Sequence, residues 1–158
     1  AHWTTMVAED VYRSRLQTTI ASLRYWVPAI ADAARIEQTE GHDFWKLSVT
    51  PAVPGACPFE LMLRTDQKFD LSIAGEIFED QEVASLDLFL PLAKAIAAGR
   101  IIQRQTESTA TASPYTLETR VELDDGAVWS KMRVLQGGNV IQAGETMIRD
   151  RHFIPYQR

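Results

Sequence analysis

Residues 59–73, FELMLRTDQKFDLSI, decide the fold class because they contain two runs in which apolar and polar residues alternate. Apolar side chains stand at positions 59, 61 and 63 and again at 69, 71 and 73. This period of two is typical of a strand with one buried face. The short polar connector 65–68 predicts a β-hairpin. The same alternation over 45–50 adds a third strand, so we expect an antiparallel meander with one face in water.

Helical spacing precedes this meander and returns after it. From Tyr12 to Ala34, apolar residues recur every three or four positions, which places them on one face of a helix. Pro28 should kink or split that helix, and Gly41 should stop it. A second helix is expected over 85–98, ended by Gly99.

The last third returns to strands, expected over 101–107, 115–123 and 128–134, with one or two more within 140–154. In the run 128–134, the even-numbered residues share one face, and Trp129, Lys131 and Arg133 share the other. The order is helix, three strands, helix, three or more strands. We therefore predict one α+β domain over residues 1–158, with an antiparallel sheet of about six strands and two main helices on one face.

Composition excludes several classes of function. The 158 residues carry a formal net charge of -5, which argues against a nucleic-acid backbone or an anionic membrane as the main partner. No apolar run approaches the ~20 residues that span a bilayer. No signal peptide is recognised, so we expect a cytoplasmic protein, although a removed presequence stays open. Arginine outnumbers lysine twelve to four, and alanine is abundant, as in GC-rich bacterial genomes.

Short catalytic and cofactor motifs are missing from the sequence. It contains no phosphate-binding glycine loop, no G-x-S-x-G, no H-E-x-x-H and no C-x-x-C. Its single cysteine, Cys57, cannot form an internal disulfide and has no neighbouring histidine or cation to activate it. We therefore predict no catalytic residue, metal ligand or cofactor, and whether the protein is an enzyme stays open.

Two groups of residues are candidates for ligand binding, with a small anion as the possible ligand. In the N-terminal half, His42 follows the first helix, and strand alternation puts Glu60 and Arg64 on the polar face of the meander near Asp70. In the last segment, basic and aromatic residues interleave around Arg149, Arg151 and His152, a composition suited to an anion or an acidic partner. Solvated charges on wet sheet faces explain the same residues.

Three functional interpretations follow. The favoured one is a non-catalytic binding or protein-interaction module that forms homo-oligomers, because an open sheet leaves edge strands free for pairing. The order of elements is similar to that of the small acidic α+β chaperones of secretion systems, a resemblance that implies a partner-binding role. The alternative is a small-molecule-binding or enzymatic domain with a pocket between helices and sheet. Nucleic-acid binding through the C-terminal segment is the least favoured.

Overall fold

A computed structural model describes residues 8–109, 114–135 and 146–157. The helices are α1 (Glu9–Trp26) and α2 (Phe89–Ala97), with short 3-10 turns at Val27–Ile30 and Leu86–Leu88. The strands are β1 (Ala34–Glu40), β2 (Phe44–Pro51), β3 (Phe59–Arg64), β4 (Lys68–Ile73), β5 (Glu76–Glu82), β6 (Ile101–Ser108), β7 (Pro114–Glu122), β8 (Val128–Val134) and β9 (Thr146–His152). The α+β class predicted from the sequence is confirmed.

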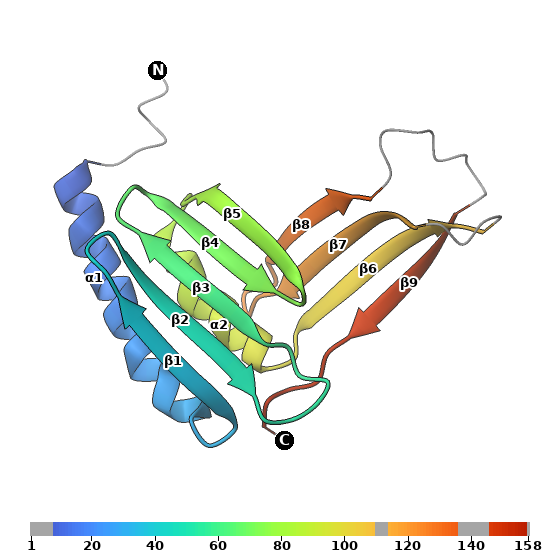
Figure 1. Ribbon diagram of the computed structural model, residues 1–158, viewed down its shortest axis with the longest axis horizontal. Coiled ribbons are helices and arrows are strands. Elements are labelled where there is room, and N and C mark those ends of the chain that lie inside the picture. The colour runs from blue at the N-terminus through green and yellow to red at the C-terminus, as the bar shows by residue number, and fades with distance from the viewer. Residues whose placement is uncertain (1–7, 110–113, 136–145, 158) are drawn as a thin grey trace.

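The strands form two antiparallel sheets rather than the single sheet of about six that the sequence predicted (Figure 1). The first has the order β1-β2-β3-β4-β5, and the second has the order β8-β7-β6-β9. Two strands escaped sequence analysis. Residues 34–40, expected at the end of the first helix, form β1, and residues 76–82, where no strand was predicted, form β5. Both are edge strands with mostly exposed side chains, so their apolar alternation is weak.

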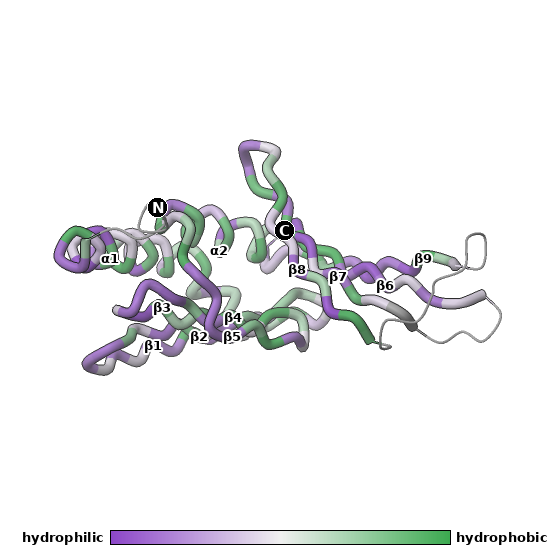
Figure 2. The backbone as a smooth tube through the Cα atoms, turned by 90° about the horizontal axis from the view of Figure 1, so that it is seen from above, coloured by the Kyte–Doolittle hydropathy of each residue, from purple (hydrophilic) through white to green (hydrophobic). Residues whose placement is uncertain are grey.

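Both helices cover one face of the first sheet, and together they enclose the core. Figure 2 shows α1 and α2 in a layer of their own beside the five strands. Tyr12, Leu16, Ile20 and Leu23 on α1 are at most 2% exposed. The strands present the alternating residues that the sequence predicted for the core, such as Leu61 and Leu71, so the hairpin 59–73 is confirmed.

Pro28 marks the end of the first helix. The α-helix ends at Trp26, and Pro28 stands in the first turn of the following 3-10 segment. That segment continues the apolar stripe through Val27 and Ile30, which are both buried. The apolar periodicity therefore continues beyond the end of the α-helix, because the 3-10 turn keeps these side chains on the same face.

The second sheet projects from one end of this two-layer body, beyond both helices (Figure 2). It is attached where β6 and β7 bury Ile101 and Val121 against the core. The Gln103 amide donates a hydrogen bond to the Ala74 carbonyl at 2.9 Å, in the turn between β4 and β5. One end of the second sheet is therefore part of the core, and the other extends away from it.

The C-terminal segment closes the junction from the other side. The Tyr156 hydroxyl donates to the Cys57 carbonyl, and the Tyr156 amide donates to the Ala97 carbonyl at 2.9 Å. The Ile154 amide donates to the Gly55 carbonyl at 3.1 Å. These bonds join the loop before β3, the end of α2 and the chain after β9. The two sheets thus share one continuous core.

Candidate functional site

The space between the helices and the first sheet is filled by side chains. Leu23, Leu47, Leu63 and Phe89 are fully buried there. Hollows lie instead at the surface beside α1. One, of about 480 Å³, lies between α1 and residues 83–87, and another, of about 500 Å³, lies between α1 and α2. A ligand site beside the helices, the alternative drawn from the sequence, would therefore lie in one of these surface hollows.

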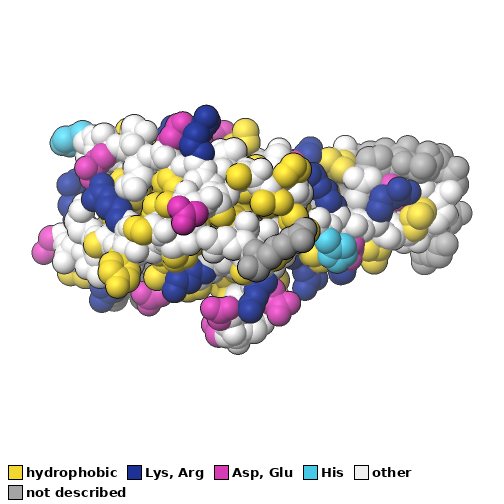
Figure 3. Space-filling view, turned by 90° about the horizontal axis from the view of Figure 1, so that it is seen from below, with side chains coloured by type: hydrophobic (Ala, Val, Ile, Leu, Met, Phe, Trp, Pro, Cys, Tyr) yellow, Lys and Arg dark blue, Asp and Glu magenta, His cyan; other side chains and the backbone are white. Residues whose placement is uncertain are grey.

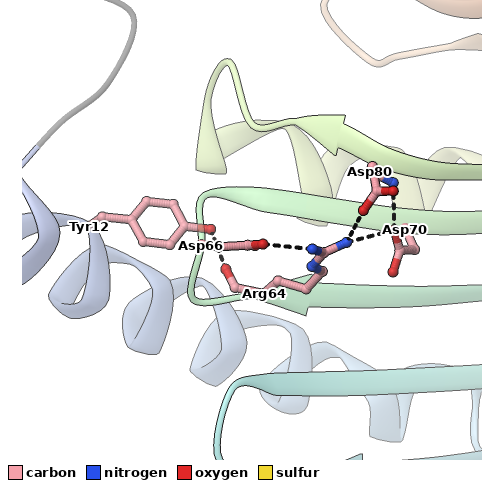
Figure 4. Close-up of polar contacts among 5 residues, drawn as sticks. All are labelled: Tyr12, Arg64, Asp66, Asp70 and Asp80. Carbon is pink, nitrogen blue, oxygen red and sulfur yellow. Dashed lines mark hydrogen bonds and ion pairs between the residues drawn. The ribbon is translucent and has the colours of Figure 1, made fainter. Parts of the chain in front are cut away.

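Arg64 is the centre of the densest polar cluster in the described residues (Figure 4). Its guanidinium contacts Asp66 at 2.6 Å, Asp70 at 3.3 Å and Asp80 at 2.5 Å. The Asp80 amide donates to the Asp70 carboxylate at 2.7 Å. The sequence predicted the neighbourhood of Arg64 and Asp70. Asp80 joins them from β5, a strand that the sequence did not predict.

Electrostatics in this cluster favour the charged forms. The hydrogen bonds that Arg64 donates to Asp80 and Asp66 raise its pKa. The hydrogen bond from Arg64 lowers the pKa of Asp80. The Tyr12 hydroxyl donates to the Arg64 carbonyl at 2.8 Å, and burial raises the pKa of Tyr12 to about 12, with the Asp66 charge acting in the same direction. One cation thus contacts three carboxylates and links the β3–β4 turn to β5. Such an arrangement stabilises the fold.

The other sequence candidates lie apart from this cluster. Glu60 is on the same polar face but accepts a hydrogen bond from Ser48 at 3.0 Å and pairs with Lys46 at 3.7 Å. His42 is exposed in the turn between β1 and β2, with its Nδ1 2.7 Å from Asp43. The described residues contain no group of three His, Cys, Asp or Glu side chains placed to hold a metal ion.

The basic residues of β9 do not converge on one site. Strand alternation places Arg149 and Arg151 on one face of the second sheet and His152 on the other. Arg149 donates to Glu107 at 3.0 and 3.2 Å, and Arg151 lies over the Phe153 ring at 4.6 Å. Lys and Arg side chains stand beside Asp and Glu over the side of the molecule drawn in Figure 3. The contacts of Arg149 and Arg151 thus lie with Glu107 and Phe153, and His152 is on the other face.

Cys57 is fully buried, and that burial raises the pKa of its thiol to about 11. A thiol that holds its proton at neutral pH is a poor nucleophile. The structure therefore agrees with a structural role for this cysteine.

Exposed apolar side chains gather on the two edge strands of the second sheet. Val128, Met132 and Val134 follow one another on the outward face of β8, with Met132 59% and Val134 61% exposed. On β9, Met147 and Ile148 are exposed as well. Sequence analysis placed the β8 residues on a common face, but alternation alone does not say whether that face is buried or in water.

The opposite face of β8 holds the strand against the first sheet. The Trp129 ring meets the Phe78 ring edge-on at 6.0 Å between centroids. Arg133 donates two hydrogen bonds to the Glu76 carboxylate, at 2.6 and 3.0 Å. These contacts to β5 fix β8 in place while its other face stays in solvent. The inner face of β8 is thus packed against the first sheet.

No family model, curated protein or solved structure matches this chain. Within the described residues, neither helix combines the length and the apolar character needed to cross a bilayer.

Proposed function

We propose that this chain is a self-associating protein-interaction module whose second sheet forms the interface. The observation that carries the proposal is the row of exposed apolar side chains on β8, Val128, Met132 and Val134. Scattered apolar residues on a surface need no explanation, but a row of them on an edge strand is typical of a contact surface. Burying them would remove apolar area from water.

The charges of the second sheet support a protein partner. Its ion pairs are internal, as in the two hydrogen bonds of 2.9 and 3.0 Å from Arg104 to Asp150. Nucleic acid would need unpaired cations, and the net charge of the chain is -5.

The test compares two glutamate variants by light scattering after size-exclusion chromatography, from micromolar to submillimolar protein. We expect the wild-type protein to dimerise. Met132→Glu should raise the dissociation constant at least ~10-fold, because it places a charge inside the contact. Ile77→Glu is the matched control, since Ile77 is 68% exposed on β5 of the first sheet.

Two results would contradict the proposal. One is a wild-type protein that stays monomeric at every concentration. The other is equal weakening by both variants, which would remove the second sheet as the specific interface.

The hollow between α1 and residues 83–87 favours a second candidate, a binding site for a small carboxylate. Its volume of about 480 Å³ lies in the usual range of ligand sites. Arg15 lines it and, among the described residues, has neither an ion pair nor a hydrogen bond from its side chain. Succinate and citrate should raise the unfolding temperature of the wild type and not of Arg15→Gln. Equal shifts in both proteins would remove this candidate.

A further inference from the structure

The backbone of β8 has one open edge. β8 is the last strand of its sheet, and among the described residues no strand pairs with its other edge. The Leu123 amide donates to the Ala127 carbonyl at 2.8 Å, so the backbone groups of Ala127 point toward β7. Neighbouring residues of a strand direct these groups to opposite edges. The amides and carbonyls of Val128, Ser130 and Met132 therefore point to the open edge.

The other three edge strands carry charges that discourage pairing. β1 contains Arg35, Glu37 and Glu40, and its side chains are mostly exposed. β5 contains four acidic residues and an irregular register against β4. β9 contains three consecutive charges, at 149–151. Charges and bulges on an edge are the usual protection against pairing with another chain.

β8 lacks this protection on its outward face. Its two cations, Lys131 and Arg133, lie on the inner face with Trp129, and Arg133 is neutralised by Glu76. The outward face carries only apolar residues and Ser130. Among the described edges, β8 is thus the one suited to accept a further strand.

We propose that two copies of this chain pair through β8, antiparallel, across a two-fold axis at Ser130. This inference rests on the proposed self-association and specifies its geometry. The axis places Val128 opposite Met132 of the second copy and Trp129 opposite Lys131 of the second copy. The first pair is apolar, and the second brings an ammonium group to an indole ring, which attracts cations. The two second sheets become one sheet of eight strands.

Two neighbouring registers are less favourable because they oppose like charges. An axis at Lys131 would place that lysine directly opposite its own copy. An axis at Met132 would place Lys131 opposite Arg133. Like charges directly across a strand pair are destabilising. The charge pattern of β8 therefore favours Ser130 as the centre over Lys131 and Met132.

Cysteine crosslinking tests the register directly. At the proposed axis the two Ser130 Cα atoms would lie about 5.5 Å apart, which a disulfide can span. Ser130→Cys should give a covalent dimer on a non-reducing gel after mild oxidation. Met132→Cys is the register control, because its two copies would be about 14 Å apart along the strands at 3.4 Å per residue. The native Cys57 is buried, so the wild type should remain uncrosslinked.

Proline tests the backbone pairing independently. Ser130→Pro removes an amide that faces the open edge and none that bonds to β7, so the monomer should keep its fold by circular dichroism. We expect this variant to be monomeric in size-exclusion light scattering and Ser130→Ala to dimerise like the wild type.

The outcomes separate the two proposals. A dimer that survives Ser130→Pro, or that crosslinks through Met132→Cys and not Ser130→Cys, overturns the β8 pairing and leaves self-association standing. A wild-type protein that is monomeric throughout overturns both. If Ser130→Pro fails to fold, the cysteine pair alone decides the register.

Discussion

The two sheets of this protein differ in what covers their apolar side chains. In the first sheet, both helices pack on the face that carries Leu61 and Leu71, and the edge strands β1 and β5 are charged. In the second sheet, Ile101 and Val121 lie in the core, whereas β8 and β9 expose apolar residues to water. The apolar face of the first sheet is covered within one chain, whereas the second sheet leaves apolar side chains uncovered, which supports the proposed self-association. The same chain thus has a covered half and an uncovered half.

The largest expected change in the free energy of unfolding is in the covered half, the first sheet with its two helices. Leu71 is fully buried between the first sheet and the helices. Leu71→Ala should lower the free energy of unfolding by about 2–5 kcal/mol, through lost transfer free energy and a residual cavity. Chemical denaturation at low protein concentration measures this change.

Met132→Ala is the comparison on the uncovered half, and it should change the free energy of unfolding of the monomer by less than about 0.5 kcal/mol. Equal losses in the two variants would show that the outward face of β8 is already packed within one chain.

A smaller loss of stability is expected where β8 packs against β5. Trp129→Ala removes the edge-on contact with Phe78, and Trp129 is partly buried. We expect a loss of about 1–3 kcal/mol, below that for a fully buried tryptophan. Thermal unfolding followed by circular dichroism checks the value. A loss near zero would mean that the Arg133–Glu76 pair and the buried end of the sheet hold β8 without the aromatic contact.

This contrast also shows how far the sequence predicts the molecule. Alternation in 59–73 identified a hairpin and its buried face correctly, because Leu61 and Leu71 lie among other strong apolar runs. In β8 the same pattern identified the strand, but the larger aromatic residue, Trp129, faces the first sheet, and the outward face is the apolar one. Which face is buried depends on neighbours distant in sequence, and the division into two sheets depends on them too.

For the candidate site residues, too, local relations are predicted from the sequence and distant ones are not. Arg64 and Asp70 meet because a short hairpin joins their strands, a local relation that sequence spacing captures. His42 and the residues of β9 lie in separate parts of the fold. Asp80 completes the Arg64 cluster from a strand whose acidic sequence resembles a turn. A positive φ of 54° at Asp80 marks an irregular position, which alternation does not encode.

The Arg64 cluster provides a further test within the covered half, with a smaller expected loss of stability. Arg64→Gln leaves three carboxylates close together without their cation. We expect a loss of about 1 kcal/mol at neutral pH, because the side chain is partly in solvent and screening weakens its pairs. Denaturation of Asp70→Asn in the same conditions serves as the control for losing one partner only. A larger loss for Asp70→Asn than for Arg64→Gln would contradict a cluster centred on the arginine.

The pH dependence of the same cluster is the smallest expected effect and the sharpest in sign. Arg64 holds the pKa of Asp80 below its ordinary value, so the unfolded chain takes up this proton at a higher pH than the folded one. The stabilisation is therefore present at neutral pH and is lost as pH falls below the ordinary aspartate range, about 4. Arg64→Gln lacks this stabilisation at neutral pH and has less to lose in acid. The difference in unfolding temperature between wild type and Arg64→Gln should consequently shrink as pH falls from 7 to below about 4. A difference that stays constant across this range would mean that Arg64 stabilises the β3–β4 turn through packing of its alkyl chain, and not through its charge.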